Sequence, residues 1–393
     1  MPNRWAALGL IGIARVSMGL HFQALPALGP MIMGDLALNF TQLGLLLGLY
    51  KFAGVFLSIP GGVLGARWGD KRVLCLSLGL LTIGGVLFAA ASSFALAMVA
   101  RIIIGAGGVL LSLQATKMTT DWFVGHEIAT AFGVLLSTWP LGIALALATA
   151  ASVAAASSWQ TAILLTAGYS GLSLVAIALC YRDPPRAADA GSPPSARRAI
   201  GRRDVVLASS AGVVWMFVNT GFIVFMTFLP AVLLGRGYTL AQAGLVTSWA
   251  SFISIASLPA AGRLADRSGR PSLVIVCGAL ATALVVVLMA TTEYPRLWII
   301  VFGFAFALGA PAVAALPGEV LTPASRGAGF GVWNTVYYIG MALTPAAAGY
   351  IVDASGGATG ALWFSAALWL AVIPALAVFR WLARRFYRSA VLT

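Results

Sequence analysis

Acidic side chains are what this 393-residue chain has least of. It carries 11 Asp and Glu residues against 24 Lys and Arg residues, and 9% of its residues are charged while 60% are hydrophobic. Its mean hydropathy is +0.96. The three cysteines, Cys75, Cys180 and Cys277, have neither the spacing of a metal site nor the number of a disulfide framework. These shortages exclude a soluble globular domain and a disulfide-stapled fold.

Long polar stretches are scarce as well. Apolar runs of roughly 20 residues, the length that crosses ~30 Å of hydrocarbon, recur from end to end and predict about twelve membrane-spanning helices. The expected helices cover residues 5–32, 41–64, 73–92, 96–117, 127–151, 160–181, 205–231, 239–261, 271–290, 296–317, 326–351 and 359–382. The expected fold class is therefore an all-α membrane protein.

One long polar segment interrupts this pattern. The stretch from Arg182 to Asp204 is dominated by Pro, Ser, Ala and Arg and has no apolar periodicity, so it predicts a flexible linker. It divides the chain into an N-terminal six-helix bundle, a cytoplasmic linker and a C-terminal six-helix bundle with a basic tail, expected at 1–181, 182–204 and 205–393.

The two halves repeat one pattern. "SIPGGVLGARWGDKR", Ser58 to Arg72, and "SLPAAGRLADRSGRP", Ser257 to Pro271, both follow the second helix of their half. Each contains Pro, then Gly, then a charged turn. Such parallel repeats are related by a pseudo-two-fold axis in secondary transporters, which bind substrate near the midplane between the halves.

The second copy resembles the cytoplasmic signature of the major facilitator superfamily. The matching residues are Gly262, Asp266, Arg267, Gly269 and Arg270. The first copy keeps matching residues at Gly62 and Arg67, but has Ala66 where the family has Asp. "RIIIGAGGVLL" resembles the family's pattern in helix four, which makes its first residue, Arg101, a candidate gating residue, with helix packing as the alternative. "RVSMGLHFQALPALGP" is weakly similar to cyanate, nitrate and carboxylate porters.

This resemblance implies gating roles for the charged turns. In the family, the Asp meets the N-terminus of a helix in the opposite half and closes the cytoplasmic side, which gives Asp266 a partner near Glu127 and Ile128. A carboxylate there gains ~0.3–1 kcal/mol. The alternative for Asp266 and Arg67 is a plain solvated turn. With Ala66 in the first copy, we expect the halves to close unequally, and Asp at position 66 to favour the outward-open state.

The basic residues predict the orientation. Lys and Arg fall in alternate loops and at the termini, whereas the other loops hold only Arg236 and Arg296. This positive-inside asymmetry predicts that both termini face the cytoplasm, in an inner membrane of bacterial type. The basic residues that give the net charge of +13 are therefore expected to set the membrane topology and to contact anionic lipid, and not to bind nucleic acid.

Two cations fall deep within predicted helices. Arg15 and Lys51 each lie about ten residues into a helix, hence ~15 Å deep, whereas every acid maps to a loop or a helix end. A charge at that depth is costly and faces the bundle interior. We therefore expect Arg15 and Lys51 to bind an anionic substrate. The alternative is that backbone carbonyls or Asp35 satisfy both cations.

Other groups are candidates to complete this site. His21 is a candidate to tune it or to carry a coupling proton, although a packing role explains it equally well. The second half offers polar and aromatic side chains at Asn219, Trp249, Asn334, Tyr337 and Tyr338. Asn334 and Tyr338 share a helix face by their i, i+4 spacing. Each of these side chains has core packing as its alternative.

The pattern as a whole predicts a secondary transporter that moves a small organic anion by alternating access. It contains no nucleophile–base pair, metal-ligand cluster or P-loop, so we expect neither an enzyme nor a cofactor. Proton-coupled efflux of drugs or lipophilic compounds is the first alternative. "STWPLGIALA" disfavours it, because Trp139 stands where drug antiporters have Gly before the Pro. A non-transporting sensor on the same fold is the second. Substrate identity, direction, coupling ion and oligomeric state are left open.

Overall fold

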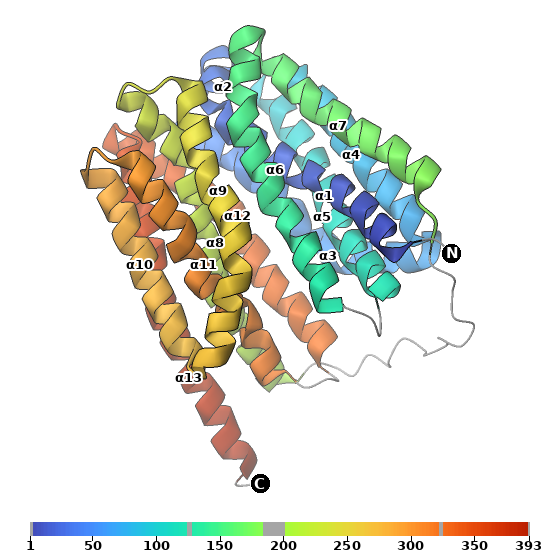
Figure 1. Ribbon diagram of the computed structural model, residues 1–393, viewed down its shortest axis with the longest axis vertical. Coiled ribbons are helices and arrows are strands. Elements are labelled where there is room, and N and C mark those ends of the chain that lie inside the picture. The colour runs from blue at the N-terminus through green and yellow to red at the C-terminus, as the bar shows by residue number, and fades with distance from the viewer. Residues whose placement is uncertain (1–2, 124–127, 184–200, 322–324, 392–393) are drawn as a thin grey trace.

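The chain forms a bundle of helices (Figure 1). The computed structural model describes residues 3–123, 128–183, 201–321 and 325–391, and all regular elements in these ranges are helices. They are α1 (Arg4–Ala27), α2 (Gly29–Asp35), α3 (Phe40–Trp68), α4 (Asp70–Ala89), α5 (Phe94–Phe123), α6 (Ile128–Ala156), α7 (Trp159–Cys180), α8 (Arg202–Gly235), α9 (Leu240–Ser268), α10 (Pro271–Thr291), α11 (Pro295–Val320), α12 (Arg326–Ser355) and α13 (Thr359–Val391).

Twelve of these helices are long and apolar enough to cross a membrane, which confirms the predicted all-α membrane fold. The additional helix is α2, which the sequence analysis merged with α1. The break falls at Leu28, immediately before Gly29 and Pro30. Proline disfavours helical geometry in the residue before it and readily begins a new helix, so the chain bends here.

The helices form two bundles of six membrane-spanning helices, with α1 to α7 in the N-terminal half and α8 to α13 in the C-terminal half. Contacts between the halves come mainly from two pairs, α3 with α12 and α6 with α9. Helix α8 begins at Arg202, within the segment predicted as linker, and residues 184–200 lie outside the described ranges. The domain boundaries remain a prediction.

The repeat extends to individual residues. Helices α3 and α9 both have 29 residues, and their numbering differs by 200. Asn39 and Gln42 form a capping box at the start of α3, and Thr239 and Gln242 form the same motif at the start of α9. Similarly, α6 begins at Ile128 and α12 at Arg326, a difference of 198.

Glycine brings the two halves into backbone contact at equivalent places. A Cβ on Gly44 of α3 would collide with the carbonyl oxygen of Pro345 in α12, and one on Gly244 of α9 would collide with that of Leu147 in α6. These two pairs are related by the numbering differences of the repeat. Small residues at such positions allow membrane helices to approach closely.

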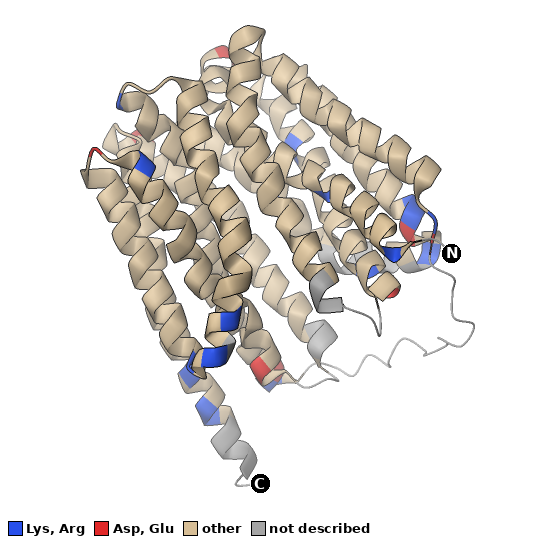
Figure 2. Cartoon of the chain, in the orientation of Figure 1, with Lys and Arg blue, Asp and Glu red and all other residues tan. Residues whose placement is uncertain are grey.

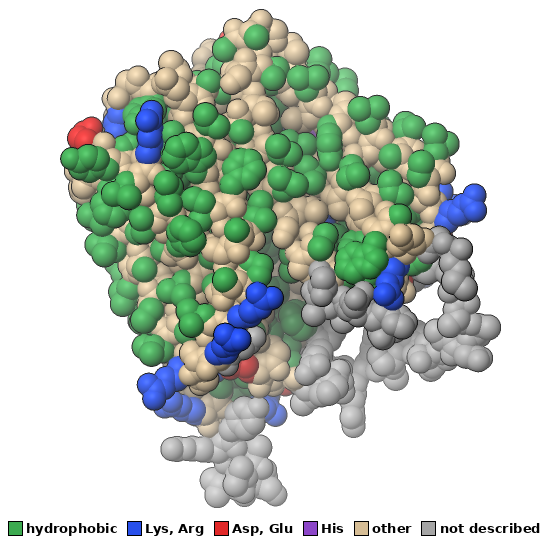
Figure 3. Space-filling model, in the orientation of Figure 1, with side chains coloured by type: hydrophobic (Ala, Val, Ile, Leu, Met, Phe, Trp, Pro, Cys, Tyr) green, Lys and Arg blue, Asp and Glu red, His purple; other side chains and the backbone are tan. Residues whose placement is uncertain are grey.

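Charged residues define two faces of the bundle. We call the end where α7 finishes and α8 begins the linker face, and the other end the opposite face. Figure 2 shows Lys, Arg, Asp and Glu gathered mainly at the ends of the helices, with few blue segments inside the bundle. In Figure 3, apolar side chains cover the middle of the visible surface. This arrangement suits a protein surrounded by hydrocarbon.

The halves are joined by hydrogen bonds on the opposite face. Asp353, near the end of α12, accepts hydrogen bonds from the backbone N–H groups of Phe40 (3.0 Å) and Thr41 (2.8 Å) and from the Thr41 hydroxyl. Gln23 of α1 donates to the carbonyl of Met226 in α8 (3.3 Å). Among the described residues, these are the hydrogen bonds that join one half to the other. In Figure 1, α6 and α9 diverge away from this face.

Candidate functional site

Arg15 lies in the middle of α1 and is only 7% exposed. Its Nη1 donates to the carbonyl oxygen of Leu135 and to the Thr138 hydroxyl (3.3 Å), both on α6. Its buried Nε has no hydrogen-bond partner. Backbone carbonyls, the alternative considered from sequence, therefore satisfy Nη1 of this guanidinium but not its Nε among the residues that the structure describes.

Lys51 lies in the middle of α3 and is 6% exposed. Aromatic rings surround its ammonium: Nζ lies 4.3 Å from the ring centre of Trp139, 5.3 Å from that of Phe22, 5.6 Å from that of Tyr50 and 6.0 Å from that of Tyr337. Trp139 comes from α6 and Tyr337 from α12, at positions related by the repeat difference of 198. Desolvated cation–π contacts of this kind stabilise an ammonium by about 2 kcal/mol or more. Lys51 is thus held by rings from both halves.

No carboxylate neutralises these two cations within the described residues. The ion pairs there join Lys117 to Asp70 and Asp121, and Arg380 to Glu319. Asp35, the acid considered from sequence, instead accepts a hydrogen bond from the indole of Trp159. Arg15 and Lys51 lie close enough for their charges to repel each other. The region between the halves therefore carries unneutralised positive charge.

Arg101 and His21 have partners inside the N-terminal half. Arg101, 1% exposed, donates from Nε to the carbonyl of Leu46 (3.0 Å) and from Nη1 to that of His21 (2.9 Å), so it ties α5 to α3 and α1. The His21 ring is hydrogen-bonded through Nε2 to Ser170 of α7 (2.8 Å). These contacts anchor helices. A gating role for Arg101 and a substrate or proton role for His21 remain predictions.

The candidates from the C-terminal half divide into two groups. Tyr337 contacts Lys51, and the neighbouring Tyr338 packs its ring against Gly54 of α3. The Asn219 amide donates to the carbonyl of Trp215 in its own helix (2.8 Å). Asn334 and Trp249 are half-buried, and no described contact joins them to either cation. Their substrate-binding roles remain predictions.

Sequence reasoning missed the aromatic lining. Phe22 follows Arg15 by seven residues, which is about two helical turns and places both on the same face, whereas the candidate chosen from sequence was the neighbouring His21. Trp139 was noted only as a departure from a drug-antiporter motif, yet its ring lies nearest to the ammonium of Lys51. Phe22 and Trp139 also contact each other, with ring centres 5.3 Å apart. The spacing from Arg15 could have identified Phe22.

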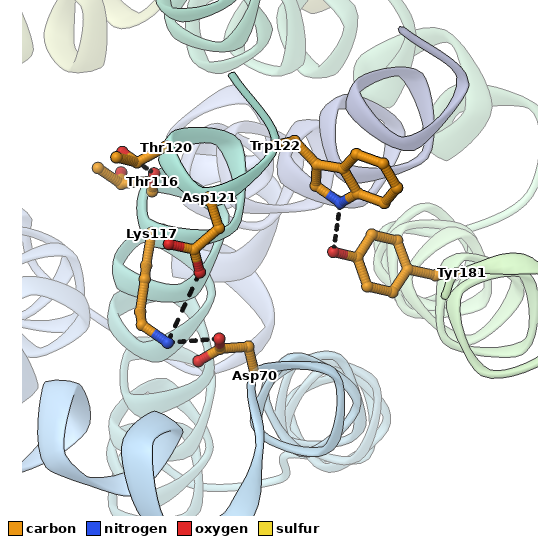
Figure 4. Close-up of polar contacts among 7 residues, drawn as sticks. All are labelled: Asp70, Thr116, Lys117, Thr120, Asp121, Trp122 and Tyr181. Carbon is orange, nitrogen blue, oxygen red and sulfur yellow. Dashed lines mark hydrogen bonds and ion pairs between the residues drawn. The ribbon is translucent and has the colours of Figure 1, made fainter. Parts of the chain in front are cut away.

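On the linker face, the first signature copy forms a charge cluster within the N-terminal half (Figure 4). Asp70, at the start of α4, pairs with Lys117 of α5, which also lies 3.8 Å from Asp121. Trp122 donates to the Tyr181 hydroxyl (2.8 Å). Arg67 is exposed. Asp70, which lies four positions after Ala66, therefore stabilises contacts between helices of the N-terminal half.

The second signature copy forms a tight turn. Gly269 ends α9 in the left-handed conformation (φ 60°), which glycine adopts without strain. Gly262 and Gly269 line a cavity of about 400 Å³ together with Pro311 and Glu319. Arg267 and Arg270 are exposed. The side chains of Asp266, Ala66 and Ile128, the surroundings of Gly62 within α3, and Glu127 as a whole lie outside what the structure describes, so the predicted latch stays a prediction.

The comparisons with known proteins agree with this architecture. The lysosomal dipeptide transporter MFSD1 of Homo sapiens is 23% identical over 361 residues, which cover 84% of this chain and 76% of that protein. The hexuronate transporter of Bacillus subtilis (strain 168) is 31% identical over 153 residues, which cover 39% of this chain and 36% of that protein.

A solved structure and a family profile extend the likeness to the whole fold. A crystal structure of a mutant of the nucleoside transporter NupG superposes with a TM-score of 0.78 at 16% identity, and covers 96% of this chain and 100% of that one. The profile of the Major Facilitator Superfamily matches residues 10–240 and 212–389. Members of this family are secondary transporters and not enzymes. The chain belongs to the major facilitator superfamily.

Proposed function

We propose that this protein moves a small organic anion across the cytoplasmic membrane by alternating access, with both termini in the cytoplasm. The observation that carries the proposal is the pair of buried cations, Arg15 and Lys51, which no described carboxylate neutralises. A buried charge in a membrane protein needs a partner. A substrate anion supplies the missing negative charge while it is bound.

The architecture supports a cycle around these cations. Lys51 is enclosed by Trp139 of the N-terminal half and Tyr337 of the C-terminal half, so a movement of one half against the other changes its surroundings. The hydrogen bonds of Asp353 hold the opposite face closed. An anion then enters and leaves on the linker face in this state, and on the opposite face after the halves have rocked. The positive-inside distribution supports a cytoplasmic location for the linker face.

One relative also supports an anionic substrate. The name of the Bacillus subtilis protein identifies its substrate as a hexuronate, which is a sugar carboxylate. Its likeness to this chain covers 39% of the residues, so it supports the chemical class of the substrate and not the particular compound.

The test is uptake of labelled organic anions into liposomes that contain the purified protein. We expect uptake of at least one carboxylate, with its neutral amide analogue inactive. Lys51→Met should reduce that uptake about 30-fold or more, since the loss of a buried charge partner costs about 2–5 kcal/mol. Ser251→Met is the matched control, because position 251 corresponds to position 51 in the repeat.

Two results would contradict the proposal. Uptake of neutral or cationic lipophilic compounds, with no competition from carboxylates, would favour efflux of such compounds. Transport that survives in Lys51→Met at the rate of Ser251→Met would show that the buried ammonium does not bind the substrate.

A further inference from the structure

Arg15 leaves one complete edge of its guanidinium unused. Nη1 is occupied by the Leu135 carbonyl and the Thr138 hydroxyl. Nε is buried without a partner, and Nη2 donates to no group within the described residues. The Nε–H and the adjacent Nη2–H point in the same direction and form a two-donor edge. Such an edge matches the two oxygens of a carboxylate.

The anchor of Arg15 fixes the orientation of that edge. Leu135 and Thr138 belong to α6, and Thr138 also donates to the Leu135 carbonyl (2.6 Å). The next residue along α6, Trp139, lies over Lys51. The residues that anchor Arg15 and the ring that lies nearest to Lys51 are therefore held by the same turn of α6.

The rings that enclose Lys51 offer an apolar wall with few hydrogen-bonding groups. Phe22 has none, and the Tyr50 hydroxyl already donates to the carbonyl of Met18 (3.1 Å). A stacked pair, Trp215 and Trp333, with ring centres 5.4 Å apart, extends the aromatic surface beyond Tyr337. A ligand body rich in hydroxyls would lose its hydrogen bonds to water against such a wall. A flat apolar ring would stack on it.

Building on the proposed anion transport, we propose that the substrate is a carboxylate attached to a flat, apolar ring. The Nε/Nη2 edge of Arg15 takes the carboxylate through two parallel hydrogen bonds. Trp139, Phe22 and Tyr337 take the ring, and the ammonium of Lys51 neutralises the carboxylate from a second direction without needing an acid of its own. Recognition thus combines a geometric fork with a stacking surface.

Binding of four probes to the purified, intact protein tests this assignment: benzoate, acetate, benzamide and glucuronate. We expect benzoate to bind at least about tenfold more tightly than acetate, since stacking and burial of the ring contribute roughly 1.4 kcal/mol or more. Benzamide has the ring without the charge, and glucuronate has the charge on a hydroxyl-rich body. We expect both to bind weakly, by calorimetry and in competition with benzoate uptake.

Two variants distinguish the contribution of the Arg15 guanidinium edge, the fork, from that of the aromatic rings around Lys51, the wall. Arg15→Lys keeps the charge but loses the fork, so it should weaken benzoate and acetate alike by about tenfold or more. Trp139→Leu should weaken benzoate and leave acetate unchanged. Arg296→Lys and Trp381→Leu are the matched controls, since both positions are exposed and far along the chain from this site.

The outcomes distinguish this inference from the anion proposal on which it rests. Equal affinity for benzoate and acetate, or tighter binding of glucuronate, overturns the ring-bearing substrate while anion transport stands. Unchanged benzoate binding in Arg15→Lys overturns the fork. Benzamide binding as tight as benzoate binding contradicts anion recognition altogether. The probe series on the unmodified protein decides these points even if a variant does not fold.

Discussion

The two halves of the molecule share a backbone plan but differ in what they bury. The N-terminal half buries three cations, Arg15, Lys51 and Arg101, whereas no charged side chain is buried in the described part of the C-terminal half. By the repeat difference of 200, Ser251 stands where Lys51 does. Helices α5 and α11 begin 201 residues apart, which places Phe302 at the position of Arg101.

The same position is stabilised by different chemistry in each half. Arg101 binds carbonyls of neighbouring helices, whereas Phe302 stacks on Phe225 with ring centres 3.9 Å apart. Both side chains fill the space between the equivalent helices. One half can therefore carry the charge that recognition requires while the other is held by apolar packing, which involves no desolvation of ions.

We expect the largest effect on stability at Arg101, whose substitution tests the difference between the two halves. Arg101→Lys keeps a buried charge but loses the fork that reaches two carbonyls. We expect a loss of about 3–6 kcal/mol in the free energy of unfolding, from two charge-assisted hydrogen bonds of about 1.5–3 kcal/mol each. Phe302→Leu should lose only about 1 kcal/mol. Denaturant unfolding in detergent measures both, and equal losses would contradict the contrast between the halves.

The next prediction concerns Lys51 and its counterpart Ser251. A charge at mid-membrane depth costs about 2.5–3.5 kcal/mol. Lys51→Met should therefore raise the thermal unfolding midpoint of the substrate-free protein, although it reduces uptake about 30-fold or more. Ser251→Lys should lower the midpoint, because no described ring encloses that position. A lower midpoint for Lys51→Met would mean that its aromatic surroundings already compensate for the full cost of burial.

A smaller effect is expected on the opposite face. Asp353 binds the N-terminus of α3, whereas the equivalent residue of the other half is Ala155, by the difference of 198. Loss of a carboxylate at a helix N-terminus costs about 0.3–1 kcal/mol, or up to ~2 kcal/mol in partly buried geometry. Asp353→Asn should therefore increase the population that is open on the opposite face about 2- to 30-fold.

Labelling of an introduced cysteine measures this population. Gln23→Cys, in a background without the three native cysteines, lies at the contact between α1 and α8. Its labelling by a membrane-impermeant maleimide should speed up in Asp353→Asn and slow down in Ala155→Asp, which adds a second carboxylate beside α9. An unchanged rate in both variants would remove Asp353 from the closing contact.

The smallest effect is expected for the ion pairs of the linker face. Asp70 with Lys117, and Glu319 with Arg380, are partly exposed pairs, one in each half. Partly exposed ion pairs contribute less than about 1 kcal/mol and are screened by salt. Asp70→Asn and Glu319→Gln should each change the free energy of unfolding by less than that, and the change should fade at high salt. A loss of several kcal/mol at either site would reveal a structural or gating role beyond simple pairing.

Most of the fold could be predicted from the sequence. Apolar runs predicted the twelve spanning helices, and the recurring charged turns predicted two related halves. Among the described residues, the one element that the sequence did not predict separately is α2, where Pro30 interrupts a run that looks continuous by hydropathy. Membrane helices are predictable in this way because every backbone group must be satisfied within its own segment, so length and apolarity largely decide the structure.

The candidate site was only partly predictable. Arg15 and Lys51 stood out because charge is rare in apolar helices, but Phe22 and Trp139 did not, since aromatic residues are common there. Their roles depend on which helices meet around Lys51, and those helices, α1, α3, α6 and α12, are separated by up to about 300 residues of chain. Local sequence patterns do not show which distant helices contact one another.

The sequence by itself determined the membrane class, the helices, the repeat and the excess of buried positive charge, because each depends on composition and spacing along the chain. Only the tertiary structure decided how that charge is held. Packing of α6 against α1 occupies one end of the Arg15 guanidinium, and it places Trp139 over Lys51 of α3. Hydrogen bonds and ring contacts between distant segments have directions in space, and the order of residues does not specify those directions.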